Sequence, residues 1–261
     1  MEADDWYDTP LYYDIIFDAD TKLEVDFLEW VSKEFGRTRR QGPLKVLEPA
    51  CGSGRLMAEF ARRGAKVSGF DLNPHMLEFA SKRFSDEGLT GKLKQARLED
   101  FSVRGAFDLA HCLVSTFKYI DSGKGARSHL ECVARHLKTG GVYVLGLHLT
   151  DYEKPRAAHE RWEEKRDGIK VVCNTRTQPA IKAKRTEDLR SRLRITEKRR
   201  TRTLETHWQF RTYNAGQIRR LLKSVPEFQL IACYDFHYDR DSPRKLDDSQ
   251  EDIVLVLRKC G

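Results

Sequence analysis

The most constraining feature of this sequence is a glycine loop that joins a short apolar strand to a helix. The strand reads Leu-Lys-Val-Leu-Glu over residues 44–48, and Pro-Ala-Cys-Gly-Ser-Gly-Arg follows it. Glycines let the backbone turn sharply beside a ligand, and the next helix offers free N–H groups. Asp71 ends the next strand seventeen residues after Gly54, where a carboxylate can bind a ribose diol. This order of elements indicates a site for an adenosine-type ligand.

On both sides of this loop, segments with the apolar pattern of strands alternate with segments that have the apolar pattern of helices. The apolar runs predict strands at residues 44–48, 65–71, 92–98, 107–113, 142–149, 228–236 and 252–257. Capping signals predict helix ends at Thr21 with Glu24, at Gly36, at Asn73 with Pro74, and at Gly140 with Gly141. Alternation of this kind predicts an α/β fold with a parallel sheet that helices cover on both faces.

Residues 151–211 break this alternation with a segment that is dense in charge. Arg190, Arg192 and Arg194 alternate with apolar residues, which is the two-residue period of half-exposed β-strands. The chain has 47 Lys and Arg against 40 Asp and Glu, a formal net charge of +7. Much of this surplus falls in the segment, so a nucleic-acid partner has to be considered there.

Other features indicate the environment of the protein. The sequence has no run of about 18 apolar residues, and it starts with acidic residues, unlike a secretory or transit signal. Its six cysteines are scattered without a C-x-x-C pair, which argues against a zinc site and a disulfide framework. We therefore expect a cytoplasmic protein with no membrane partner and no metal.

Two adenosine-containing cofactors fit such a loop. A dinucleotide site needs a third glycine for close packing of helix on strand, and Met57 stands at that position. Glu48 precedes the loop, and its carboxylate would repel a pyrophosphate but suit an ammonium group. The pattern therefore favours a ligand with adenosine at one end and an amino acid at the other, which is S-adenosylmethionine.

At this point the sequence resembles the class I S-adenosylmethionine-dependent methyltransferases. Residues 46–55 match the family's E/D-x-G/A-x-G-x-G loop, and residues 69–77 match its D-x-S/N-x-x-M-L segment. The likeness continues at residues 98–101 and 107–113, and is closest to small-molecule methyltransferases of the amine and amino-sugar type. It implies a Rossmann-like, doubly wound sheet of seven strands, mostly parallel with an antiparallel last strand, and an antiparallel β insertion after the fifth strand.

The resemblance implies three divisions of the chain. Residues 1–43 would form an N-terminal lid and helix. Residues 44–150 and 213–261 would form the S-adenosylmethionine-binding core. Residues 151–212 would be the β insertion, which covers the substrate site.

The same resemblance implies the cofactor contacts. Glu48 and the backbone of Ala50 and Gly52 would hold the methionine part, and Asp71 the ribose. Arg97 stands where many relatives carry an aspartate, so the acid that meets the adenine stays open. The full set is Tyr13, Glu48, Ala50, Gly52, Gly54, Asp71, Leu72, Met76, Leu98, Glu99, Asp100, Cys112 and Leu113.

For the methyl acceptor, the expected contacts are Tyr13, His148, His207 and Arg211. His148 ends the fifth predicted strand on the ligand side of the sheet, and it is the best-placed proton acceptor. His207 and Arg211 share one face of a strand, whereas Trp208 and Phe210 on the other face are expected in the core.

The resulting hypothesis is a methyltransferase that transfers a methyl group by in-line displacement to a small molecule, with an amine as one candidate. Two alternatives stay open: an RNA methyltransferase that uses the basic insertion, and a non-catalytic nucleotide-binding domain. Residues 182–202 contain no aromatic side chain, which disfavours recognition of RNA bases by stacking.

Overall fold

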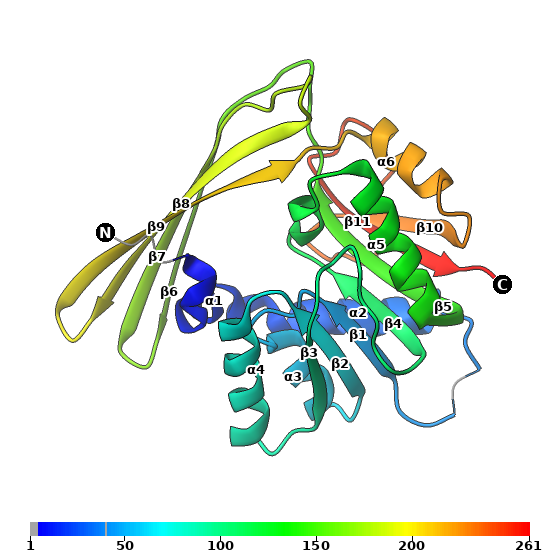
Figure 1. Cartoon of the computed structure of the whole chain (residues 1–261), viewed down its shortest axis with the longest axis horizontal. Helices are drawn as coiled ribbons and strands as arrows, with labels where there is room; N and C mark the ends of the chain where they lie inside the picture. Colours follow the sequence, from blue (N-terminus) through cyan, green and yellow to red (C-terminus); the bar gives the residue numbers. More distant parts are fainter. Residues whose placement is uncertain (1–4, 40) are drawn as a thin grey trace.

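The computed structural model describes residues 5–39 and 41–261, and it contains two β-sheets (Figure 1). The core sheet has seven strands in the order β10-β11-β5-β4-β1-β2-β3. Its strands are β1 (Lys45–Pro49), β2 (Lys66–Asp71), β3 (Gly91–Gln95), β4 (Phe107–Cys112), β5 (Leu137–His148), β10 (Phe228–Tyr234) and β11 (Asp252–Lys259). Strands β1 to β5 are parallel, and β11 pairs antiparallel with both β5 and β10. The predicted fold class is confirmed.

Helices cover both faces of the core sheet because alternate strand residues are apolar on both sides. Val46 packs with α2, α3 and α4 on one face, while its neighbour Leu47 packs with α5 and α6 on the other. The helices are α1 (Pro10–Phe17), α2 (Thr21–Glu34), α3 (Arg55–Arg62), α4 (Pro74–Asp86), α5 (Gly123–His136) and α6 (Ala215–Lys223). Three short 3-10 helices are η1 (Trp6–Asp8), η2 (Asp18–Asp20) and η3 (Thr116–Tyr119). Among the described residues, no helix is both long and apolar enough to span a membrane.

The second sheet, called the insertion sheet below, follows β5 and is antiparallel throughout. Its strands are β6 (Ala158–Arg166), β7 (Ile169–Thr177), β8 (Thr186–Glu197) and β9 (Arg200–Arg211). Its inner face packs on the N-terminal segment, where Ile15 and Ile16 of α1 share an apolar cluster with Val171 and Leu193. Helix α1 therefore lies between the two sheets (Figure 1).

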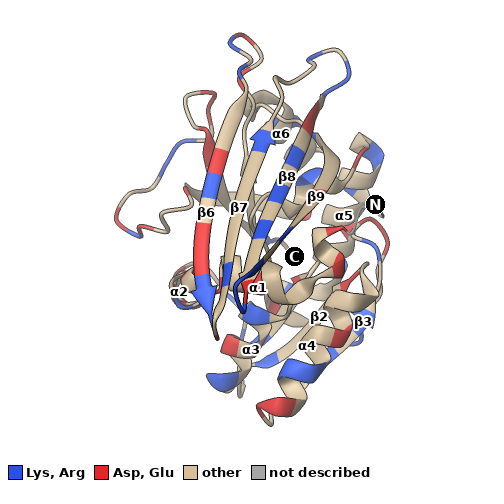
Figure 2. Cartoon of the chain, turned by 90° about the vertical axis from the view of Figure 1, so that its left-hand side faces the viewer, with Lys and Arg blue, Asp and Glu red and all other residues tan. Residues whose placement is uncertain are grey.

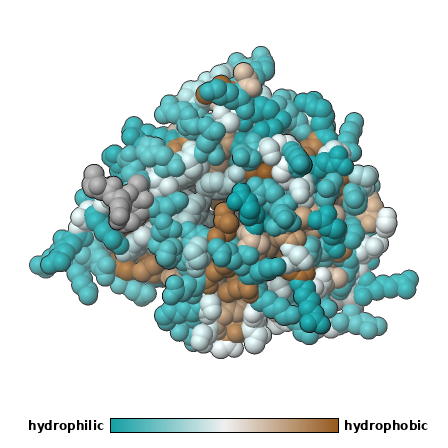
Figure 3. Space-filling model, viewed as in Figure 1, coloured by the Kyte–Doolittle hydropathy of each residue, from teal (hydrophilic) through white to brown (hydrophobic). Residues whose placement is uncertain are grey.

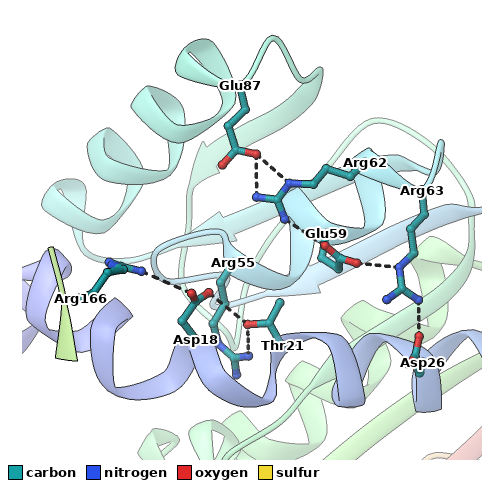
Figure 4. Close-up of polar contacts among 9 residues, drawn as sticks. All are labelled: Asp18, Thr21, Asp26, Arg55, Glu59, Arg62, Arg63, Glu87 and Arg166. Carbon is teal, nitrogen blue, oxygen red and sulfur yellow. Dashed lines mark hydrogen bonds and ion pairs between the residues drawn. The ribbon is translucent and has the colours of Figure 1, made fainter. Parts of the chain in front are cut away.

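Two capping predictions for α2 are wrong. The N-cap is Asp20, and no side chain caps the helix. Thr21 and Glu24 instead bind Arg55 of α3. Figure 4 shows the contact of Thr21, whose oxygen lies 3.1 Å from the guanidinium. Gly36 follows the helix without a left-handed conformation, and it is needed for close packing because a Cβ there would lie 2.4 Å from the carbonyl oxygen of Ser32.

The predicted helix end at Gly140–Gly141 is also wrong. Helix α5 ends at His136, and β5 starts at the next residue, so both glycines lie inside the strand. Gly140 has a φ of 78°, and the pairing with β4 shifts register beside it. The glycines therefore form an irregularity within a long strand rather than a helix terminus.

A single buried carboxylate connects the core, the glycine loop and the insertion sheet. Asp14 of α1 is 0% exposed. It accepts hydrogen bonds from Ser53 of the loop at 2.6 Å and from Arg83 of α4 at 2.5 Å, and Arg166 of β6 lies 2.7 Å away. Burial alone would raise the pKa of Asp14, but these partners together hold it below its ordinary value.

We expect Asp14→Ala to lower the free energy of unfolding by about 3 kcal/mol at neutral pH, because two arginines lose a buried carboxylate. Because folding lowers the pKa of Asp14, this stabilisation is fully present at pH values above the pKa of the carboxyl in the unfolded chain. It is lost as the pH falls through the pKa of the carboxyl in the folded protein. Urea unfolding at neutral pH and at about pH 3 measures both effects. Asp26→Ala, which removes an exposed partner of Arg63, should cost less than about 1 kcal/mol, and equal losses would contradict the assignment.

Candidate functional site

The glycine loop lies at the carboxyl edge of the core sheet, between β1 and α3. Ala50, Gly52 and Gly54 all have positive φ values, at 53°, 51° and 71°. A Cβ on Gly54 would lie 2.9 Å from the Cβ of Ala80 in α4. Gly54 thus combines a left-handed backbone with close packing of two helices, a combination that a larger residue would disrupt.

Asp71 ends β2 and contacts this loop directly. Its Oδ2 accepts a hydrogen bond of 2.8 Å from the N–H of Gly52, and its Oδ1 accepts one of 2.9 Å from Asn73. Burial raises the pKa of Asp71 despite these bonds. The glycine loop and Asp71, which the sequence pattern assigns to one ligand site, are therefore in contact.

Glu48 and His111 form a buried pair beneath the loop. Glu48 is 7% exposed and His111 is 0% exposed, and His111 Nε2 lies 4.0 Å from Glu48 Oε2. Among the described residues, neither Glu48 Oε2 nor either His111 ring nitrogen has a hydrogen-bond partner. Burial raises the pKa of Glu48 well above its usual value and lowers the pKa of His111 to about 3. Both groups are thus held toward their neutral forms.

Tyr13 of α1 lies against the outer side of the loop. A Cβ on Gly52 would be 3.7 Å from Tyr13 Cε1. The ring packs edge-on against Trp6 and lies 4.6 Å, centroid to centroid, from Phe17. Burial raises the pKa of the Tyr13 phenol. Tyr13 therefore lies against the loop and also lines the cavity described next.

A cavity of about 650 Å³ lies between the core sheet and the insertion sheet. It is bounded by the chain after β4, the end of β5, the N-terminal segment, the inner face of the insertion sheet, and residues 248–252. Its aromatic side chains are Trp6, Tyr7, Tyr13, Phe17, Tyr119, Trp162, Trp208 and Phe210. Hydrophilic side chains cover most of the surface in Figure 3, with apolar ones emerging near the middle and below it.

His148 lies at this cavity and is paired with an acid. His148 ends β5 opposite Asp252 of β11, and His148 Nδ1 is hydrogen bonded to Asp252 Oδ1. Both residues line the cavity. Because an ionised carboxylate only accepts, Nδ1 donates this bond and the lone pair of the neutral ring lies on Nε2. Sequence reasoning missed Asp252, which only the antiparallel register brings to His148.

The other two predicted acceptor contacts do not line this cavity. His207 is exposed and binds Glu205, while Arg211 donates to the carbonyl of Asp121. Phe210 is buried and Trp208 packs against the apolar cluster of α1, as expected of core residues, and both also line the cavity. The alternation along β9 is confirmed, but the face that meets the cavity is that of Trp208 and Phe210, which the sequence alone does not reveal.

The remaining predicted cofactor residues differ in exposure. Met76, Cys112 and Leu113 are buried, and burial raises the pKa of Cys112 to about 12. Leu72 is 55% exposed, and Asp100 is exposed as well.

Leu98 and Glu99 are half-buried, and their backbone carbonyls are already engaged. His129 Nδ1 bonds the Leu98 carbonyl at 2.9 Å, and Ser128 donates to the Glu99 carbonyl at 2.6 Å. Arg97 lies 3.7 Å from the Glu99 carboxylate, so these two charges balance each other.

Comparison with known proteins agrees with this architecture. Residues 46–141 match the family model described as "Methyltransferase domain". A relative from Saccharopolyspora spinosa, dTDP-4-amino-2,3,4,6-tetradeoxy-D-glucose N,N-dimethyltransferase, is 32% identical over 109 residues, 42% of each chain. The chain spans about half the length of the first curated relatives it matches, from 42% to 56%.

Two solved structures share the fold over nearly the whole chain. An S-adenosylmethionine-dependent methyltransferase from Clostridium acetobutylicum has a TM-score of 0.75 at 20% identity, and covers 95% of this chain and 96% of its own. CalS10, an amino pentose methyltransferase from Micromonospora echinaspora, has a TM-score of 0.67 at 16% identity, over 92% and 90%. Residues 46–141 are therefore similar to the family described as "Methyltransferase domain", and the chain as a whole shares the fold of these two solved structures.

Proposed function

We propose that this protein is an S-adenosylmethionine-dependent methyltransferase that acts on a small molecule. The observation that carries the proposal is the buried carboxyl of Glu48, whose Oε2 has no partner among the described residues and lies at the loop edge near Asp71. A ligand ammonium group would satisfy this oxygen, and the residues present therefore fit the cofactor.

The cofactor would supply a methyl group on a positively charged sulfur, which is already an activated donor. Glu48 would bind its ammonium group, and the backbone at Ala50 and Gly52 its carboxylate. Asp71 keeps lone pairs for the ribose hydroxyls beyond its two backbone bonds. Tyr13 would exclude water from the loop, since its ring already covers Gly52.

The cavity supports an acceptor that carries an amine. Its wall contains six acids against three Lys and Arg side chains, although the whole chain has a net positive charge. The acids are Asp151, Glu160, Glu187, Asp248, Glu251 and Asp252. Aromatic faces attract cations as well. The relative from S. spinosa, whose name specifies an amino sugar and N,N-dimethylation, supports the same acceptor class.

His148 would take the proton of the acceptor. In-line methyl transfer depends mainly on alignment of nucleophile, methyl and sulfur, but an amine must be neutral to attack. Asp252 holds the ring of His148 so that Nε2 is the free proton acceptor. Trp208 and Phe210 would position the acceptor from the insertion sheet.

The first prediction concerns the ribose. Asp71→Ala should weaken binding of S-adenosylmethionine and of its demethylated product at least tenfold by calorimetry, because charge-assisted hydrogen bonds are lost. Asp86→Ala, which removes an exposed acid of α4, is the matched control and should leave affinity unchanged. Absence of saturable binding to the unaltered protein would refute the proposed function.

The second prediction concerns Glu48. Its pKa is raised on folding, so the ionised form destabilises the free protein as the pH rises above the pKa of the unfolded carboxyl. Glu48→Gln should therefore increase the free energy of unfolding at neutral pH while weakening cofactor binding. Urea unfolding and calorimetry measure the two effects. A variant that is less stable and binds the cofactor normally would show that Glu48 is purely structural.

The third prediction concerns His148. His148→Asn should lower kcat about 100-fold with a small change in the KM of the acceptor, because a proton acceptor is lost, and the loss should shrink at high pH as the amine loses its proton to solvent. Asp252→Asn should show the same pH pattern with a smaller loss. His237→Asn, in an exposed pair with Asp235, is the control. A pH-independent loss would assign His148 a structural role.

A further inference from the structure

The outer face of the insertion sheet is a basic surface that the proposed reaction does not use. Outer-face residues alternate with the inner ones that line the cavity or contact α1. The seven cationic side chains of this outer basic face are Arg161, Lys165, Lys170, Arg176, Arg190, Arg192 and Arg194. It carries only three acids, Glu163, Asp188 and Glu205. Figure 2 looks onto this face and shows the blue bands along β8.

Several of these cations have no acid to balance them. Glu163 forms ion pairs with both Arg161 and Lys170, and Glu205 forms one with Arg192. Within the described part of the chain, no ion pair involves Arg176, Arg190 or Arg194. The register places Arg176 directly opposite Arg190. Two like charges at paired positions repel each other unless an anion binds both.

The surface is hollowed at these cations. One concavity of about 220 Å³ is lined by His159, Asn174, Arg176, Arg190 and Arg192. A second, of about 310 Å³, is lined by Arg161, Lys170, Val172, Asn174, Arg194 and Thr196. Asn174 belongs to both, so the two concavities adjoin, and each combines cations with a neutral hydrogen-bonding group.

From these observations we propose that the outer basic face binds double-stranded RNA through its phosphates and 2′-hydroxyls. The four strands carry no Phe, Tyr or Trp on this face. That composition disfavours single strands, whose bases stack on aromatic rings. It also disfavours protein partners, because protein interfaces combine arginine anchors with Trp and Tyr, and this face has neither of the two. It also disfavours a lipid surface, because few apolar side chains could enter it.

The shape of the surface favours RNA over DNA. A four-stranded sheet is too broad for the major groove of DNA, which admits a helix or a two-stranded ribbon. The minor groove of an RNA duplex is wide and shallow, and it presents 2′-hydroxyls between phosphates. Asn174 and Thr196 stand among the arginines as neutral partners for those hydroxyls. This inference does not depend on the methyltransferase proposal, because the face and the cavity lie on opposite sides of the insertion sheet.

Fluorescence anisotropy with a labelled RNA duplex of about 20 base pairs tests the proposal on the full chain. We expect saturable binding with a Kd of about 10 μM at about 100 mM salt, weakening steeply as salt rises. The triple variant Arg176→Gln, Arg190→Gln, Arg194→Gln should bind at least tenfold more weakly and lower the salt slope by about 2 to 3. The control variant Lys33→Gln, Lys66→Gln, Lys92→Gln removes equal charge from exposed positions elsewhere, and should retain binding within about twofold.

Competing duplex DNA, single-stranded RNA and vesicles with anionic lipid complete the test. Weaker binding of all three than of duplex RNA supports the proposal. Equal or tighter binding of any of them overturns it, as does an equal loss in the two triple variants. Circular dichroism and thermal unfolding establish that both variants are folded. Calorimetry with S-adenosylmethionine, run separately, distinguishes failure of this proposal from failure of the proposed function.

Discussion

The buried contacts of Asp14 are the constraint on which the arrangement of the two sheets depends. One carboxylate on α1 accepts from Ser53, and it pairs with Arg83 and Arg166. Removal of a carboxylate from water is costly unless cations and donors surround it, so these groups have to stay together. The glycine loop, helix α4 and the end of β6 are therefore held to the N-terminal segment. Because the N-terminal segment and β6 both line the cavity, this attachment holds two of its walls together.

A second polar group, Glu48, has the opposite character. Asp14 is satisfied by its neighbours, whereas Glu48 Oε2 has no hydrogen-bond partner among the described residues and stands 4.0 Å from a neutral His111. Buried polar groups without partners are destabilising, and they are expected at sites that a ligand completes. The charge of Arg55 partly offsets the effect of burial on the pKa of Glu48, but its guanidinium is bound to Glu24 and Thr21 and does not pair with Glu48 Oε2. Arg55 is thus engaged in holding α3 to α2, while Glu48 Oε2 keeps an open hydrogen-bonding position among the described residues.

Much of the core could be predicted because its pattern is local. The loop, Asp71 and the alternation of strands and helices follow from spacing, and the structure has them as predicted. Failures arose where partners are distant in sequence. Thr21 and Glu24 have capping-box spacing, but Arg55 from another helix attracts both side chains. Gly140 resembles a helix terminus, but it lies in a strand that continues across it.

The residues expected to contact a methyl acceptor were harder to predict, because their surroundings also depend on partners distant in sequence. Asp252 is 104 residues away from His148, and only the antiparallel pairing of β11 with β5 brings them together. In β9 the two-residue period was evident, but which face meets the cavity depends on how the insertion sheet sits against α1. Trp208 and Phe210 consequently line the cavity that His207 and Arg211 were expected to contact. Domain boundaries and cofactor residues stay predictions.

The strict alternation along β8 has an evolutionary consequence. Leu189 and its next-but-one neighbours face inward, while Arg190, Arg192 and Arg194 face outward. A shift of register by one residue would exchange the two sets completely, so selection on either face keeps the register of both. Within that register, substitutions at odd and even positions act on separate surfaces. The lining of the cavity and the charge of the outer face can therefore diverge independently among descendants of this chain.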